Sequence, residues 1–305
     1  MINRLLSFLD SSPVNFLAVK NISDMLVAGG FRQLDPCQPL GAVNAGDRFF
    51  VTKNDSSVFA FRIGRKPMAE AGFHMICAHS DSPTFRIKPN AEMLCEGGIV
   101  KLNTEVYGGP IMSTWFDRPL TLAGRVIVRG EDVMHPSTML LHIKRPLLQI
   151  SNLAIHFNRN VNAGNPLSKQ KDMLPIAAIV SDSMSKNNFL IDQIKERLEI
   201  ADSKDILDFD LMLYNCQKSQ LVGFNKEFIC SGRIDDLSMA HAALSALLNS
   251  DNPATTKVMA IFDNEETGSG TKQGAASPVL ASILHRVATC MGLDDEGFYQ
   301  ALSRS

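Results

Sequence analysis

The sequence has no long apolar run, no closely spaced cysteine pair and no excess of charge of either sign. Among its 305 residues, no uninterrupted apolar stretch approaches the roughly 20 that a membrane-spanning helix needs. The apolar stretch from Leu5 to Leu9 is followed at once by Asp10 and is too short for a signal peptide. These absences predict a cytoplasmic protein with no membrane as a partner.

The charge balance and the cysteine spacing further restrict the kind of protein that this sequence can encode. The chain has 30 basic and 32 acidic residues and no Lys/Arg block, so we expect no nucleic acid as a partner. Its 6 cysteines stand far apart, which predicts reduced thiols rather than a disulfide frame or a zinc ribbon. With 45% hydrophobic residues, the chain can bury a large core and is long enough for two domains.

The pattern of elements is α/β at both ends and β-rich in the middle. A helix is predicted from Ser12-Pro13 to Gly29-Gly30, followed by a hairpin over 48–63 and a buried strand over 73–78. Short β segments occupy about 91–224, and α/β alternation then returns with a helix from Asp235 or Asp236 and a strand to Phe262. We therefore predict an α/β domain formed by 1–90 and 225–305, interrupted by a β-rich inserted domain over 91–224.

The strand that ends at Phe262 leads directly into three carboxylates. Asp263, Glu265 and Glu266 are followed by a Gly/Ser turn over 268–270. Open α/β sheets bind ligands beyond the carboxyl ends of their strands, and adjacent glutamates there can divide metal binding from proton transfer. A solvated acidic turn after a strand is the plain structural alternative.

Three further clusters of polar residues stand at the ends of predicted elements. His79 and Asp81 follow a buried strand, and Asp81 could hold the imidazole of His79, although its side chain could equally cap the next segment. Asp235 and Asp236 precede a helix, where acidic residues are also favoured by the helix dipole. His156 is predicted on an alternating strand, where a lone histidine is usually structural.

All of these clusters fit one family. The chain resembles the aspartyl aminopeptidase and vacuolar aminopeptidase I family of zinc peptidases along its whole length. The matching segments, in order, are 78–83 (Ala-His-Ser-Asp-Ser-Pro), 107–109 (Tyr-Gly-Gly), 113–118 (Ser-Thr-Trp-Phe-Asp-Arg), 122–126 (Leu-Ala-Gly-Arg-Val), 152–156 (Asn-Leu-Ala-Ile-His), 233–237 (Arg-Ile-Asp-Asp-Leu) and 263–266 (Asp-Asn-Glu-Glu). The resemblance implies a catalytic α/β domain with two zinc ions per complete site. It also implies an inserted domain that makes subunit contacts in a large homo-oligomer acting on peptides.

The resemblance also implies a role for each site residue. His79 and Glu266 would each bind one zinc ion, Asp235 would bridge both, and Asp81 would orient His79. Glu265 would be the general base that deprotonates the attacking water. His156 would reach the site of a neighbouring subunit and steady the developing oxyanion.

Two departures from the family pattern qualify these expectations. Relatives commonly have asparagine where this chain has Asp236. They also continue beyond the segment that matches 299–305, into regions that supply an aspartate ligand and a second histidine ligand. We therefore expect a C-terminally truncated family member with an incomplete catalytic domain and weak or no activity.

Three functions follow as alternatives. The first is a zinc-dependent aminopeptidase that removes N-terminal residues, with acidic residues favoured by family analogy. The second is a catalytically silent family member that acts at most as an assembling subunit. The third is a metal-dependent amidohydrolase of another kind, such as a deacylase.

Overall fold

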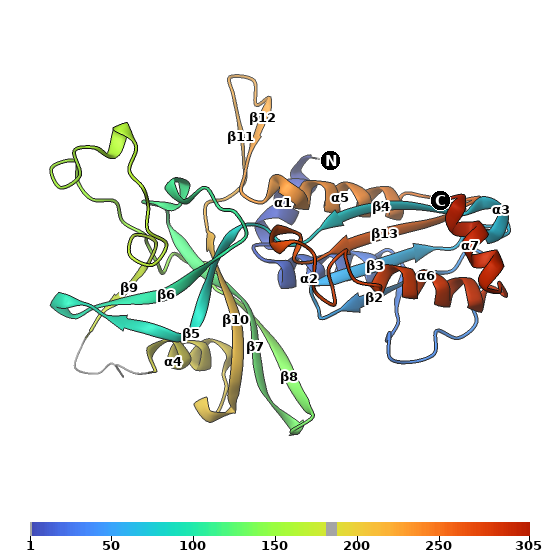
Figure 1. The fold of residues 1–305 in the computed structure, drawn as a ribbon, viewed down its shortest axis with the longest axis horizontal. Coiled ribbons are helices and arrows are strands. Elements are labelled where there is room, and N and C mark those ends of the chain that lie inside the picture. Colours follow the sequence, from blue (N-terminus) through green and yellow to red (C-terminus); the bar gives the residue numbers. More distant parts are fainter. Residues whose placement is uncertain (1, 181–187) are drawn as a thin grey trace. The chain divides into compact units, whose positions relative to one another are not determined.

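The structure, a computed structural model, describes residues 2–180 and 188–305 and divides the chain into two compact units (Figure 1). The first unit comprises Met1–Ser82 and Ser219–Ser305, and the second comprises Pro83–Lys218. The sequence placed these boundaries after residues 90 and 224. The first boundary falls earlier because β5 (Thr84–Leu94) pairs with strands of the second unit, β6 (Ile99–Tyr107) and β10 (Ile206–Asn215), and the second falls earlier, between Lys218 and Ser219.

The first unit is an α/β fold built on one mixed sheet, which confirms the predicted fold class. Its strands lie in the order β1-β2-β3-β13-β4, and the pairs β1–β2 and β13–β4 are parallel while β2–β3 and β3–β13 are antiparallel. The strands are β1 (Arg32–Gln33), β2 (Arg48–Lys53), β3 (Ser57–Arg62), β4 (Phe73–His79) and β13 (Thr256–Phe262). The helices are α1 (Ile2–Ser11), α2 (Asn15–Ala28), α3 (Met68–Ala71), α5 (Ile234–Leu248), α6 (Val279–Cys290) and α7 (Asp295–Ser303).

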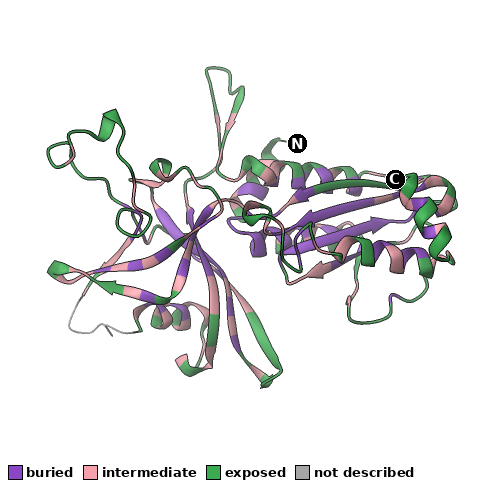
Figure 2. Ribbon diagram, viewed as in Figure 1, coloured by how far each residue is buried: buried purple, intermediate pink, exposed green. Residues whose placement is uncertain are grey.

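The central strands β3 and β13 are buried on both faces, whereas β4, which was predicted to be a buried strand, lies at the edge of the sheet and is exposed from His74 to Cys77. Successive side chains of a strand point to opposite faces, so β3 sends Val58 and Ala60 into one core and Phe59 and Phe61 into the other. The first core is shared with α1, α2 and α5, and the second with α6 and α7. Figure 2 shows the central strands of this sheet as buried between the helices. Burial on both faces explains why β3 and β13 are continuous apolar runs in the sequence.

The amino-terminal helix differs from its prediction. α2 begins at Asn15, and its N-cap residue Val14 forms no side-chain cap hydrogen bond, so Ser12 is not the cap that the sequence suggested. A separate helix, α1, precedes it and was not predicted. Phe8 and Leu9 of α1 are buried against α5, and this long-range packing stabilises a helix too short to be recognised from its own sequence.

The second unit is built on a sheet of its own. The strand order is β8-β7-β10-β5-β6-β9, all antiparallel to their neighbours, with β7 (Leu120–Asp132), β8 (His135–His142) and β9 (Ile176–Ile179) completing the set. Helix α4 (Phe189–Leu198) packs Leu190 and Ile194 into the core that this sheet forms. In the part of the second unit that the structure describes, the β segments expected from the sequence therefore correspond to a six-stranded sheet packed against α4.

Candidate metal centre

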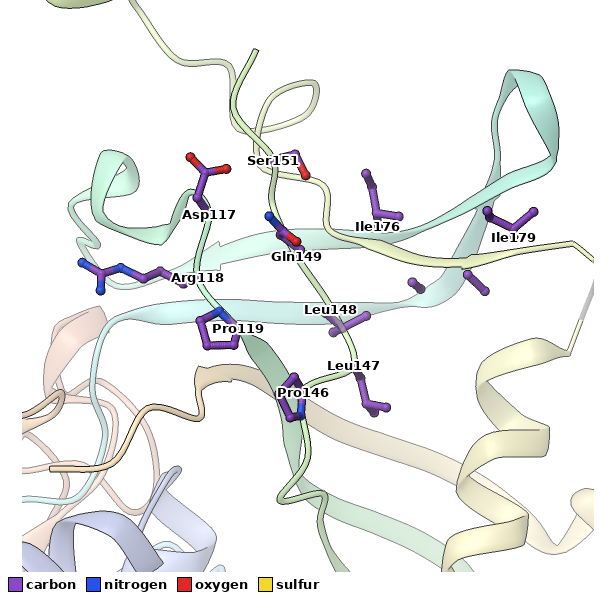
Figure 3. Close-up of a pocket in the computed structure, with 12 residues that line it drawn as sticks. Asp117, Arg118, Pro119, Pro146, Leu147, Leu148, Gln149, Ser151, Ile176 and Ile179 are labelled. Atoms are coloured by element: carbon purple, nitrogen blue, oxygen red, sulfur yellow. The ribbon is translucent and has the colours of Figure 1, made fainter. Parts of the chain in front are cut away.

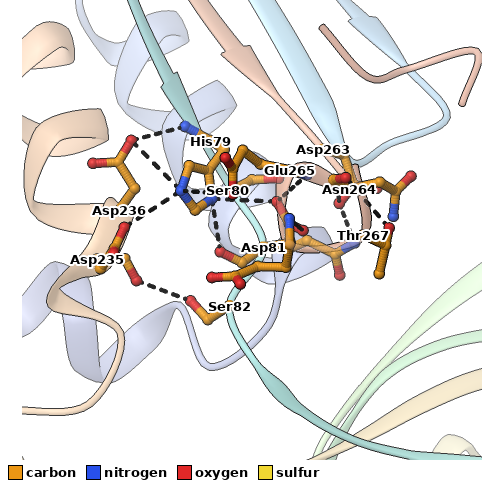
Figure 4. Close-up of polar contacts among 12 residues, drawn as sticks. His79, Ser80, Asp81, Ser82, Asp235, Asp236, Asp263, Asn264, Glu265 and Thr267 are labelled. Carbon is orange, nitrogen blue, oxygen red and sulfur yellow. Dashed lines mark hydrogen bonds and ion pairs between the residues drawn. The ribbon is translucent and has the colours of Figure 1, made fainter. Parts of the chain in front are cut away.

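Two parallel strands deliver the candidate residues to one edge of the first sheet. Strands β4 and β13 run side by side, with His79 opposite Phe262 in the register. The carboxyl ends of parallel strands meet at the same edge, so His79 and the acidic segment after Phe262 emerge together. A short 3-10 helix, Glu265–Thr267, follows and brings ligand atoms of both glutamates within 4.8 Å of His79; Figure 4 shows Glu265 beside His79.

The imidazole of His79 lies between carboxylates on both sides. Its Nδ1 is 3.1 Å from the backbone oxygen of Asp81 and 3.3 Å from Asp81 Oδ1. Its Nε2 is 3.4 Å from Asp235 Oδ1 and 3.9 Å from Glu265 Oε2. One nitrogen is thus held by the protein while the other faces the acidic side chains, as in metal-binding histidines with a fixed tautomer.

Asp81 ties His79 to the acidic segment. Its carboxylate is buried, and its two oxygens accept hydrogen bonds from the backbone N–H groups of Glu265 and Glu266, each at 3.2 Å. The same carboxylate lies beside His79 Nδ1. One buried side chain therefore orients both the imidazole and the backbone that carries the two glutamates.

The start of α5 supplies the other carboxylates. Asp235 and Asp236 have non-helical backbone angles, and Arg233, the N-cap residue of α5, forms no side-chain cap hydrogen bond. Asp236 Oδ2 accepts a hydrogen bond from the backbone N–H of His79 at 3.1 Å, and Ser82 Oγ donates to the backbone oxygen of Asp235 at 3.3 Å. These bonds fix the beginning of α5 beside the end of β4.

The electrostatics of the cluster favour a cation. Burial raises the pKa of Glu266, and the nearby charges of Asp81 and Glu265 raise it further. Burial also raises the pKa of Asp236. For His79 burial opposes protonation, but the hydrogen bond and charge of Asp81 outweigh it and raise its pKa to about 9. A cation among these groups would relieve the repulsion between carboxylates.

The donor atoms fit zinc. One ligand atom from each of His79, Glu265 and Glu266 can be chosen so that all three lie within 4.8 Å of one another. An imidazole nitrogen with carboxylate oxygens is a donor set that zinc binds in proteins. The structure therefore brings together His79, Asp81, Asp235, Glu265 and Glu266, which the sequence had singled out from three separate segments.

The chain matches the family described as aminopeptidase I zinc metalloprotease (M18) over residues 8–303. The chain belongs to this family. A probable M18 family aminopeptidase 2 of Clostridium novyi is 48% identical to it over 303 residues, which cover 99% of this chain and 70% of the relative. Membership of a zinc metalloprotease family supports zinc as the metal for these donors.

Solved structures of family members share the fold. The structure described as the Ape4 and Nbr1 complex matches with a TM-score of 0.90 and 34% identity, covering 98% of this chain and 61% of that one. The mApe1 dodecamer of S. cerevisiae matches with a TM-score of 0.80 and 22% identity, covering 94% of this chain and 66% of that one. This chain thus spans about two thirds of the length of the family structures that it matches.

His156 is the candidate residue whose local structure was predicted wrongly. The segment after Ser151 forms no strand; His156 lies in an exposed turn in which the N–H of Phe157 donates to the backbone oxygen of Ala154. The preceding Asn152 is held by Asp117, whose carboxylate accepts hydrogen bonds from the backbone and side-chain nitrogens of Asn152. Alternating apolar residues suggested a strand, but no neighbouring strand pairs with this segment in the described structure.

Asn15 supports the acidic segment after β13, and sequence reasoning missed it. Its side-chain nitrogen donates to Asp263 Oδ1 at 3.0 Å, and Asp263 is buried at the end of β13. Asp263 also accepts the N–H of Asn264 at 2.8 Å, so it shapes the acidic turn instead of offering a ligand. No local pattern links residues 248 positions apart, and only the fold reveals this pair.

A pocket of about 540 Å³ lies in the second unit (Figure 3). Asp117, Arg118 and Gln149 supply its polar wall, while Leu148, Ile176 and other apolar residues supply the rest. None of the candidate metal-site residues lines it. The pocket therefore does not contain the candidate metal centre.

Among the described residues, no helix is long and apolar enough to cross a membrane.

Proposed function

We propose that this chain is a zinc-dependent aminopeptidase, which hydrolyses the N-terminal peptide bond of peptides. The observation that carries the proposal is the approach of donor atoms from His79, Glu265 and Glu266 at one edge of the sheet. Family membership supports the reaction class. By family analogy, peptides with an acidic N-terminal residue are the favoured substrates.

The proposed metal ligands are His79, Asp235 and Glu266, with two zinc ions per complete site. His79 and Glu266 would each hold one ion, and the carboxylate of Asp235 would bridge them. Support comes from the 3.4 Å separation between His79 Nε2 and Asp235 Oδ1. Bound zinc supplies Lewis acidity and lowers the pKa of water towards neutrality.

Glu265 is the proposed general base. It accepts a proton from the attacking water, whose oxygen adds to the carbonyl carbon of the first peptide bond. Glu265 then returns the proton to the leaving nitrogen as the carbon–nitrogen bond breaks. The buried Asp81 accepts the backbone N–H of Glu265, so it holds this base in place during both transfers.

Assembly and location are part of the proposal. A family member of the same fold is described as a dodecamer, and we propose that this chain also forms a homo-oligomer. In that assembly His156 would steady the oxyanion in the site of a neighbouring subunit. All 6 cysteines lie in the described part of the chain and are free thiols, which supports action in the reducing cytoplasm.

A pair of substitutions tests the division of roles. In a version of the protein that carries the C-terminal regions found in its relatives, Glu265→Gln should retain zinc yet lose about 10²–10⁴-fold in turnover, because it removes a positioned base. Asp235→Ala should lose zinc, because the bridging carboxylate serves both ions. Zinc content and hydrolysis of a glutamyl-nitroanilide are measured on each purified variant. Equal loss of zinc in both would show that Glu265 is a ligand.

The same assay separates the alternatives. Hydrolysis of aminoacyl-nitroanilides but not of acyl-amino acids supports an aminopeptidase over a deacylase. If the zinc-loaded 305-residue chain hydrolyses neither substrate, the catalytically silent subunit becomes the better description. Zinc bound per chain, measured on the same sample, distinguishes a silent site with metal from one that binds none.

A further inference from the structure

A cavity of about 220 Å³ lies inside the second unit, between its sheet and α4. Its walls are side chains of the apolar core: Leu102 and Leu122 from the strands, Ile143 from the segment after β8, and Leu190 and Ile194 from α4. Each of these side chains belongs to a residue that is at most 8% exposed. An apolar cavity of about 150 Å³ is already large enough to hold benzene, so this one has room for a small organic molecule.

The segment that carries Arg145 along the cavity is held on both sides of this residue. Before it, the backbone oxygen of Ile143 accepts hydrogen bonds from the hydroxyl of Thr121 at 3.0 Å and from the hydroxyl of Tyr214 at 2.8 Å. After it, the backbone N–H groups of residues 147–148 both donate to the first residue of β7. Arg145 therefore lines the cavity from a fixed backbone, while the residue as a whole is exposed to solvent.

The polar side chains that line the cavity, Arg145 and Gln193, both offer hydrogen-bond donors. The amide oxygen of Gln193 already accepts a hydrogen bond from Arg197 Nη1 at 2.7 Å, which leaves its NH₂ group as the available donor. Among the described residues, no carboxylate lines the cavity, and none forms an ion pair or hydrogen bond with the guanidinium of Arg145. The cavity thus combines apolar walls with donors that suit one anionic group.

We propose that this cavity binds an amphipathic monocarboxylate of the fatty-acid type. The apolar tail would lie among the leucine and isoleucine side chains, and the carboxylate would pair with Arg145, whose guanidinium binds carboxylates through two parallel hydrogen bonds. A free amino acid fits poorly, because its ammonium group would meet no carboxylate in the lining. A neutral alcohol of the same length would gain the apolar contacts without the ion pair. This site lies in the second unit and goes beyond the peptidase function proposed above.

Isothermal titration of octanoate into the purified full chain tests the proposal. We expect one octanoate per chain with a Kd below about 0.1 mM, within reach of a small ligand that fills an apolar cavity, and at least about tenfold weaker binding of 1-octanol. Arg145→Gln should weaken octanoate binding at least about tenfold and remove the preference over octanol. Arg129→Gln is the matched control, because Arg129 is an arginine of the same unit that pairs with Asp205 and does not line the cavity.

A second pair of variants locates the bound molecule. Ala177→Phe places a large side chain in the wall of the cavity and should abolish octanoate binding, whereas Ala178→Phe, which borders only the larger pocket of the second unit, should not. Thermal midpoints, measured alongside, show which variants remain folded. A wild-type chain that binds no octanoate, binding of octanol as tight as that of octanoate, or an equal loss in Arg129→Gln would overturn the proposal. So would equal effects of the two alanine substitutions in folded protein. None of these readouts depends on zinc or hydrolysis, so a failed peptidase assay leaves the result interpretable.

Discussion

At the scale of single residues, the candidate metal centre depends most on the carboxylate of Asp81. This side chain positions other site residues and need not contact metal or substrate itself. Asp81 is buried, accepts two backbone N–H groups and lies beside His79 Nδ1. A neutral amide in its place keeps the shape but has one acceptor oxygen and a donor nitrogen. One of the two backbone N–H groups would then face another donor, and His79 would lose its charged neighbour.

Asp81→Asn should therefore weaken zinc binding by about 10–100-fold, the usual cost of altering a partner of a metal ligand. Competition with a chromophoric chelator measures the zinc affinity. Asp24→Asn is the matched control, because Asp24 is exposed and pairs with Lys20 within α2, away from the candidate metal centre. An affinity that falls equally in both variants, or in neither, would contradict the role given to Asp81.

A second prediction at the residue scale concerns His241, which lies buried in α5 against Phe8 with ring centroids 5.4 Å apart. Burial lowers the pKa of His241, and the charge of Arg4 lowers it further. The unfolded chain therefore binds this proton more readily than the folded one. The contribution to stability is present above the unfolded value of about 6.5 and is lost as pH falls through and below it.

Urea unfolding from pH 5 to 8 checks this expectation. The free energy of unfolding of the wild type should decrease below about pH 6.5 relative to that of His241→Leu, which cannot be protonated. Both proteins carry the same other titrating groups, so their difference isolates His241. Parallel curves for the two proteins across this range would show that His241 does not titrate differently on folding.

At the scale of secondary-structure elements, the close packing of neighbouring strands restricts which residues a strand can carry. In the second unit Gly124 of β7 lies opposite Leu211 of β10 and has a φ of +154°. A Cβ at this position would collide with the backbone oxygen of Asp210. Gly124→Ala should cost about 1–3 kcal/mol of stability, as expected for overpacking. Chemical denaturation measures it.

The chain offers a matched control for this substitution. At Gly109 no neighbouring atom of the described structure lies within 4 Å of the place that a Cβ would take, and φ is not positive. Gly109→Ala should therefore be close to neutral. Equal stability of the two variants would mean that β7 and β10 can separate without cost. Such an outcome would show that the close packing of β7 against β10 contributes little to the stability of the second unit.

Element by element, sequence and structure agree where local signals are strong. The hairpin over 48–63, the strands ending at His79 and Phe262, and the convergence of their carboxyl ends were all predictable from apolar runs and parallel pairing. α1, the turn around His156 and the hairpin formed by β11 (Gln220–Val222) and β12 (Phe228–Cys230) were not. α1 depends on packing against distant α5, and alternating apolar residues cannot by themselves show whether a partner strand exists.

At the scale of the whole molecule, the two units differ in how the chain builds them. The first unit is discontinuous, because β13 from the later segment lies between β3 and β4 from the earlier one. The second unit is a single stretch with a core of its own. The metal-site candidates reflect this: His79 and Asp81 come from before the second unit, and Asp235, Glu265 and Glu266 from after it.

This difference predicts the behaviour of fragments. Residues 83–218 contain every strand of their sheet and their whole apolar core, so they should fold alone and unfold cooperatively in urea. Residues 1–82 alone should remain largely unfolded, because β3 and β4 would both lose their shared neighbour β13. Circular dichroism and dispersion of amide proton resonances distinguish the two states. A folded 1–82 fragment, or an unfolded 83–218 fragment, would mean that the stability of each unit depends on contacts other than its own sheet and core.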